Sequence, residues 1–170
     1  MQKIMWPFLK KIKSYPKNLN CKYCGELNLI DEAHSFSFGD SELINEFRIL
    51  QYEGGRDDED IKICFHPPKK GRVDQVAWTS VIDSTVEYVL QSFDCLLDTC
   101  YERIYEMRSH AGEIESTRGK LSDRISLSLI RVYHDKRFDL LCCIACEEYR
   151  CEDVDICFDK NKNLLSFTGI

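Results

Sequence analysis

The stretch Ser80–Arg108, SVIDSTVEYVLQSFDCLLDTCYERIYEMR, decides the fold of this chain. Its apolar residues recur at steps of three and four, which is the spacing of one face of an α-helix. That face consists of Ile82, Val86, Val89, Phe93, Leu96, Leu97, Cys100, Ile104 and Met107. Thr79 or Ser80 is the expected N-cap, and Arg108 followed by Gly112 gives the expected end. The spacing predicts one long amphipathic helix that packs an apolar stripe on the rest of the chain.

Strand-like segments lie on both sides of this helix. They alternate apolar with polar residues, and turn-forming residues rich in Gly, Asp and Asn separate neighbouring segments. The expected strands are residues 34–38, 47–52, 61–66, 125–133, 138–146, 154–158 and 164–168. The pattern predicts an α+β fold in which an antiparallel meander sheet packs against the long helix.

The chain of 170 residues reads as a single α+β domain, with neither an internal repeat nor a dividing linker. Residues 1–25 are expected as an appendage that contains a short basic helix at 3–13 and a CxxC turn. That short helix either docks on the body, the favoured reading, or lies on a membrane surface through Trp6 and Phe8. No run approaches the roughly 18 apolar residues of a membrane span. The N-terminus lacks the apolar core of a secretory signal, so a cytoplasmic location with reduced thiols is expected.

Charge is distributed unevenly along the chain. Residues 1–25 contain six lysines and no acidic residue, whereas the whole chain has a net charge of −6. An acidic body makes nucleic acid an improbable partner for most of the surface and favours a basic one. The exposed edges of a meander are also natural places for a homodimer to form.

The segment Cys21-Lys22-Tyr23-Cys24-Gly25 resembles half of a zinc ribbon, in which a tight turn points two thiolates at one ion. Tetrahedral zinc needs two more ligands. Cys143 and Cys146 repeat the CxxC spacing, although on a strand they converge only if the strand breaks there. The sequence leaves three interpretations of this turn open. One is a structural zinc on Cys21 and Cys24, completed by Cys143 and Cys146 or by another cysteine or histidine. The others are a structural turn with two free thiols and a redox CxxC, which lacks the strand-to-helix context that would lower a thiol pKa.

Catalytic motifs are absent from the sequence. There is no nucleophile elbow, no phosphate-binding glycine loop and no H-E-x-x-H. A dyad of Cys64 or Cys142 with His34 is the enzymatic alternative, and it requires a thiol of lowered pKa. The chain is therefore expected not to be an enzyme.

The C-terminal part, approximately residues 75–170, resembles small α+β immunity proteins of bacterial polymorphic-toxin systems. The likeness rests on the order of the elements and on the acidic lead EEYRCED at 147–153, followed by the strand VDICFD and a last strand that ends in Gly-Ile. It implies a non-enzymatic cytoplasmic protein that binds one cognate toxin and blocks its active site.

The residues themselves suggest how such binding would work. Two acidic clusters could occupy the basic cleft of a toxin and accelerate association. The expected partner-binding residues are Tyr52, Asp57, Asp58, Glu59, Asp60, Glu147, Glu148, Tyr149, Glu152 and Asp153. The alternative is a zinc-ribbon adaptor whose basic head contacts nucleic acid or another protein.

Overall fold

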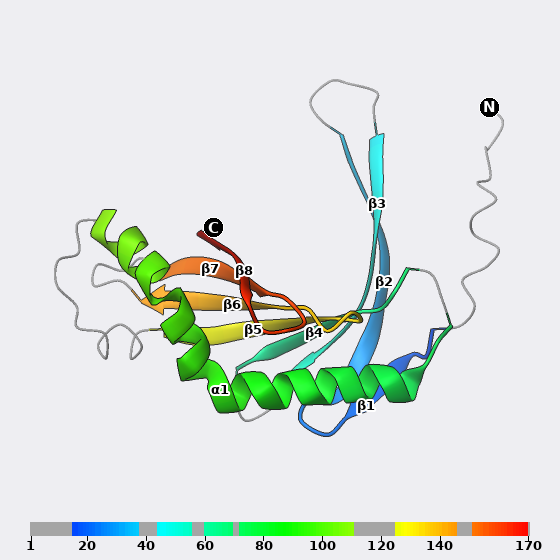
Figure 1. The fold of residues 1–170 in the computed structure, drawn as a ribbon. Helices are drawn as coiled ribbons and strands as arrows, with labels where there is room; N and C mark the ends of the chain where they lie inside the picture. The colour runs from blue at the N-terminus through cyan, green and yellow to red at the C-terminus, as the bar shows by residue number, and fades with distance from the viewer. Residues whose placement is uncertain are drawn as a thin grey trace.

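The computed structural model describes residues 15–37, 44–55, 60–69, 72–110, 125–145 and 151–169. Within these ranges the chain forms one eight-stranded sheet and one long helix (Figure 1). The elements are β1 (Asn18–Cys21), β2 (Gly25–Ser37), β3 (Ile44–Gly55), β4 (Lys62–His66), α1 (Gln75–His110), β5 (Ile125–Tyr133), β6 (Phe138–Ala145), β7 (Cys151–Phe158) and β8 (Leu164–Gly169). The predicted α+β class is confirmed, and the predicted helix at 3–13 lies outside the described residues.

The strands follow one another across the sheet in chain order. Every neighbouring pair is antiparallel except β4 and β5, which run parallel. The prediction of a purely antiparallel meander is wrong at this pair. The reason is the crossover: α1 carries the chain from the end of β4 back to the opposite end of the sheet, which places β5 in the same direction as β4.

The hairpin of β1 and β2 was not expected as part of the sheet. Cys21 and Gly25 are paired across its turn, and Gly25 has a φ of +64°, which glycine adopts at little cost. Leu19 and Leu27 from the two strands are buried in the core. The CxxC turn is therefore the first hairpin turn of the sheet and not an appendage to it.

The helix α1 begins before its predicted start. The backbone N–H of Ala77 donates to Asp74 Oδ1 at 3.0 Å, so Asp74 is the N-cap. The hydroxyl of Thr79 donates instead to the carbonyl of Gln75, so the predicted cap at Thr79 or Ser80 is wrong. At Ser92 the backbone leaves helical geometry (φ −120°, ψ 15°), and α1 bends there (Figure 1).

The apolar stripe of α1 forms the centre of the core, as predicted. Its buried members are Ile82, Val86, Val89, Leu96, Leu97 and Cys100. They belong to one core cluster with the inward residues of the sheet, which are Leu19, Leu27, Ile63, Phe65, Ile130, Val132, Leu140, Ile156 and Phe158. Near the start of α1, the ring of Trp78 lies 5.8–6.3 Å from the rings of Tyr15, Tyr52 and Phe65.

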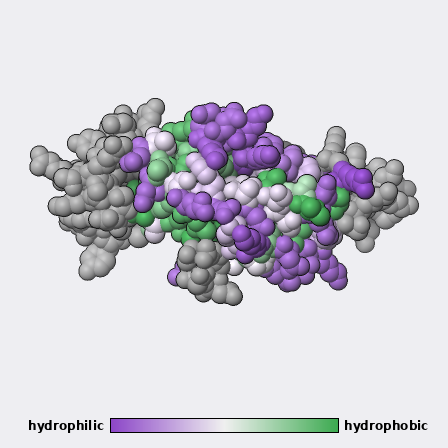
Figure 2. All heavy atoms as spheres, turned by 60° about the horizontal axis from the view of Figure 1, so that its bottom comes forward, coloured by the Kyte–Doolittle hydropathy of each residue, from purple (hydrophilic) through white to green (hydrophobic). Residues whose placement is uncertain are grey.

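Figure 2 brings forward the lower side of Figure 1, along which α1 runs. Where this face is coloured in Figure 2, hydrophilic and hydrophobic residues are intermixed. Among the described residues, Val76 and Leu165 are the exposed large hydrophobic side chains. None of the described helical segments has both the length and the apolarity that crossing a bilayer requires.

Candidate functional site

The face of the sheet turned away from α1 carries a row of polar side chains across six strands. Neighbouring members are paired in the register of the sheet: Glu53 on β3, Cys64 on β4, Arg131 on β5, Asp139 on β6, Cys157 on β7 and Ser166 on β8. Their chain neighbours, such as Ile63, Ile130 and Ile156, are buried under α1. Because side chains alternate between the two faces of a strand, this row lies on the opposite face.

Two carboxylates on this face are held by side chains of β5. Arg131 Nη1 donates to Asp155 Oδ2 at 2.7 Å. The hydroxyl of Tyr133 donates to Asp139 Oδ2 at 2.5 Å, and Asp139 is only 9% exposed. Burial, together with this hydrogen bond, raises the pKa of Tyr133 well above its ordinary value. These contacts join β5, β6 and β7 through their side chains as well as through the backbone.

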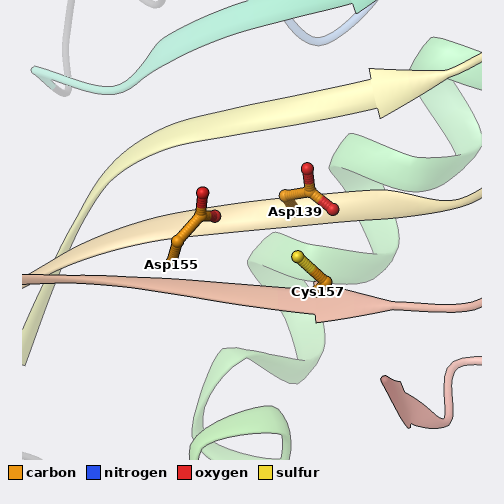
Figure 3. Close-up of side chains that lie close together, drawn as sticks. All are labelled: Asp139, Asp155 and Cys157. Carbon is orange, nitrogen blue, oxygen red and sulfur yellow. The ribbon is translucent and has the colours of Figure 1, made fainter. Parts of the chain in front are cut away.

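Asp139, Asp155 and Cys157 form the one group of three or more possible metal ligands found among the described residues (Figure 3). One ligand atom of each lies within 4.8 Å of the others. Asp155 Oδ1 is buried and has no hydrogen-bond partner in the described part of the chain. However, Arg131 already compensates the charge of Asp155, and burial raises the pKa of the Cys157 thiol. A divalent cation would have to compete with the guanidinium and deprotonate the thiol. The group therefore fits a charge-compensated network better than a cation site.

His66 lies beside this network. Its ring stacks on the ring of Tyr133, with 5.0 Å between the centroids. Burial and the nearby charge of Arg131 lower the pKa of His66 below its ordinary value of 6.5. The unfolded chain therefore takes up a proton on His66 at a higher pH than the folded protein does.

We expect the free energy of unfolding to fall as the pH drops from about 7.5 to about 5.5, with His66 contributing part of the loss. In His66→Gln that contribution disappears, so the loss over the same interval is smaller. Urea unfolding of both proteins at the two pH values measures the difference. His134→Gln, which makes the same substitution at an exposed turn, is the control for replacing a histidine by glutamine. Equal losses in the wild type and His66→Gln would contradict the expectation.

The predicted zinc ligands Cys21 and Cys24 lie in the core, 8% and 3% exposed. The turn between them docks on α1, because the N–H of Tyr23 donates to Asp83 Oδ1 and the hydroxyl of Tyr23 bonds to Glu87. The described groups of three or more possible ligands do not include this pair. The placement favours a packing role for the two thiols.

Cys143 cannot complete a site with the CxxC turn. It lies on β6, whereas Cys21 lies on β1, at the edge of the sheet. Five strand spacings of about 4.8 Å separate the two strands, roughly 24 Å in all. A shared zinc ion requires ligands about 2.3 Å from the metal. Cys146, the other expected ligand, lies outside the described residues.

The two predicted acidic clusters are described only in part. Asp60 and Asp153 are exposed. The structure does not describe residues 57–59 and 147–149 or the side chain of Glu152. Tyr52, expected at the contact, is instead 0% exposed, and its hydroxyl donates to the carbonyl of Pro16. Tyr52 is thus a core residue and is not available to a partner.

The strand ends that flank the two clusters share one end of the sheet. Residues 56–61 join β3 to β4, and residues 146–150 join β6 to β7. Lys62, the first residue of β4, pairs with Leu129 on β5. Leu129 also pairs with Leu141 on β6, four residues before Ala145, where β6 ends. The start of β4 and the end of β6 are therefore about 10 Å apart across the sheet and about 13 Å apart along it. We call this end, with segments 56–61 and 146–153, the acidic end.

The buried thiols are poor nucleophiles. Burial raises the pKa of Cys64 to about 11 and that of Cys142 to about 12, and it also raises the pKa of Cys100. A thiol in this environment stays protonated at neutral pH, whereas a catalytic cysteine needs a lowered pKa. The dyad proposed from the sequence therefore lacks an activated thiol at either Cys64 or Cys142.

In native protein, we expect iodoacetamide to label Cys95, which is exposed, much faster than Cys64, Cys100 or Cys142. Cys95 is accessible to the reagent, whereas burial hides the other three thiols and raises their pKa values. Timed quenching followed by peptide mass spectrometry measures the individual rates, and protein unfolded in urea provides the reference in which the four rates converge. Rapid native labelling of Cys64 or Cys142 would contradict this expectation and revive the enzymatic alternative.

The sequence did not single out Arg131, Tyr133, Asp139 or Asp155, although its alternation pointed to their strands. Polar residues at every second position of 130–133 and 154–159 indicated one face away from the core. Which of these side chains meet depends on the register between strands, which alternation does not give. Comparison of the chain with protein-family models, with curated proteins and with solved structures finds no match.

Proposed function

We propose that this chain is a non-enzymatic immunity protein that binds a basic bacterial toxin through its acidic end and blocks the toxin's active site. The proposal places the complex in the cytoplasm of the cell that makes both proteins. One observation supports it: the ends of β4 and β6, which flank two acidic segments far apart in the sequence, lie at the same end of one sheet.

The two segments are rich in carboxylates. Segment 56–61 contains Asp57, Asp58, Glu59 and Asp60 with one arginine, and segment 146–153 contains Glu147, Glu148, Glu152 and Asp153 with one arginine. The separation of their flanking strand ends fits within a footprint of about 800 Å² on one partner. A partner with a basic cleft would meet both segments at once.

Such a surface acts first on the rate of association. Clustered carboxylates raise the local concentration of a basic partner and orient its approach, and salt screens this effect. Many enzymes that attack nucleic acid have basic clefts, so an acidic inhibitor can cover the cleft that the substrate would enter. The raised pKa values of the Cys64 and Cys142 thiols support a role without covalent catalysis.

The test is capture of the partner from the native bacterium with tagged chain at moderate salt. We expect one near-stoichiometric protein with a basic domain, released as the salt concentration rises. Asp60→Asn/Asp153→Asn should retain less of it. Asp94→Asn/Asp98→Asn is the matched control, because it also removes two exposed carboxylates but from α1, and it should retain as much as the wild type. Equal retention by both variants, or a captured partner without basic character, would contradict the proposal.

A further inference from the structure

Two hairpin turns and the segment that follows β4 lie together at the opposite end of the sheet. The hairpin turn 134–137 lies beside the hairpin turn 159–163, because Phe138 and Phe158 are paired on the adjacent strands. The segment 67–69 adjoins the first of them, since the N–H of His134 donates to the carbonyl of His66. We call these three segments the basic end.

The basic end contains five basic residues and two acidic ones, a net charge of +3. The basic residues are Lys69, Lys136, Arg137, Lys160 and Lys162, and all five are exposed. The two carboxylates are engaged locally: Asp135 pairs with Arg137, and Asp159 accepts hydrogen bonds from Asn161 and Asn163. This local excess of positive charge belongs to a chain whose net charge is −6.

Each hairpin turn has a lysine in the left-handed region. Lys136 and Lys162 both have a φ of 70°, and in both turns the N–H of this lysine donates to the carbonyl three residues earlier. Glycine or asparagine is the usual residue in such a position. The ammonium of Lys162 lies 3.3 Å from the ring centroid of Tyr88, which accounts for a lysine there. Lys136 makes neither an ion pair nor a ring contact with any described residue, so packing does not account for it.

We propose that the basic end binds the phosphate backbone of nucleic acid. Lys136 has an unfavourable backbone conformation, and its ammonium has no ion-pair or ring partner among the described residues. A lysine at such a position points to a ligand outside the fold. The carboxylates of the acidic end do not cancel this charge. The eight residues of β6 span roughly 26 Å, more than two Debye lengths at about 0.1 M salt. The two ends therefore act independently, and this inference does not rest on the proposed function.

The test uses fluorescence anisotropy of a labelled oligodeoxythymidine of about 20 nucleotides, titrated with full-length chain at several salt concentrations. We expect a dissociation constant of about 10⁻⁴ to 10⁻⁵ M at low salt and a log–log salt slope of about −2, the value for three phosphates on a single strand. Lys136→Gln/Lys160→Gln should flatten the slope by about 1.4. Lys22→Gln removes an exposed lysine at the β1–β2 turn and should leave the slope unchanged.

A second variant separates binding from folding. Lys136→Gly relieves the left-handed backbone, so we expect its unfolding midpoint to rise while its oligonucleotide affinity falls at least twofold. Lys160 has no positive φ, and Lys160→Gly should not raise the midpoint. Unchanged oligonucleotide affinity in Lys136→Gln/Lys160→Gln would overturn the proposal. So would equal competition by polyglutamate, which indicates an acidic protein partner, or salt-sensitive self-association of the chain, which indicates that its own acidic end fills the site.

Discussion

Phe158→Ala is expected to lower the free energy of unfolding by about 3–5 kcal/mol, one of the two largest effects that we predict. Phe158 is 0% exposed and stacks on Phe138 with 5.0 Å between the ring centroids. The ring of Tyr88 on α1 lies edge-on against Phe138. Removing the Phe158 ring therefore leaves a cavity where β6, β7 and the helix meet, and it also removes an aromatic stack.

Urea denaturation followed by circular dichroism measures this loss. Leu165→Ala is the control, because Leu165 on β8 is 57% exposed and its truncation should change stability by no more than about 0.5 kcal/mol. Comparing Phe158→Ala with Leu165→Ala also tests which face of the sheet α1 covers, since Phe158 lies on the face toward α1. Equal effects of the two substitutions would mean that α1 does not cover this face.

Arg131→Met is expected to cost about 1–3 kcal/mol, because it leaves Asp155 half-buried without its guanidinium partner. Asp155 Oδ1 already has no hydrogen-bond partner among the described residues, so the carboxylate would also lose the 2.7 Å hydrogen bond that Arg131 donates to Oδ2. The side chains of Arg131 and Asp155 are 28% and 24% exposed, which leaves the pair only partly screened by water.

A double-mutant cycle isolates the pair. Arg131→Met/Asp155→Leu should recover part of the loss, since the unpaired carboxylate is then gone. Arg137→Met is the matched control: it breaks the ion pair with Asp135, whose two side chains are 52% and 42% exposed, and should change stability little. If Arg131→Met were as mild as Arg137→Met, Arg131 would not hold the face of the sheet together.

The sequence predicted those parts of the fold that depend on local periodicity. The stripe from Ile82 to Cys100 repeats every three or four residues, so its burial could be read directly. The hairpins β5–β6 and β7–β8 were expected because polar turns separate alternating segments. The start of α1 was misplaced because Thr79 and Asp74 are both suitable caps by residue type, and only the backbone geometry distinguishes them.

The pairing of strands that are far apart in the chain could not be predicted from the sequence. The parallel β4–β5 pair depends on how α1 crosses the sheet, and the network of Arg131, Tyr133, Asp139 and Asp155 depends on the register of three strands. The shared end of the strands that flank the two acidic segments has the same origin, since 84 residues lie between the segments and only the topology brings those strands together. Residue type alone likewise placed Tyr52 at a partner contact, although its ring is needed in the core.

The most direct test of the proposed function is a titration of the captured toxin's activity with purified chain. We predict that activity falls linearly and vanishes near one equivalent of chain. Charge neutralisation of the acidic end should shift the endpoint to a large excess, whereas Lys136→Gln/Lys160→Gln should leave it unchanged. Full toxin activity in the presence of saturating chain would contradict the account, because a partner that binds without losing its activity is not the target of an immunity protein.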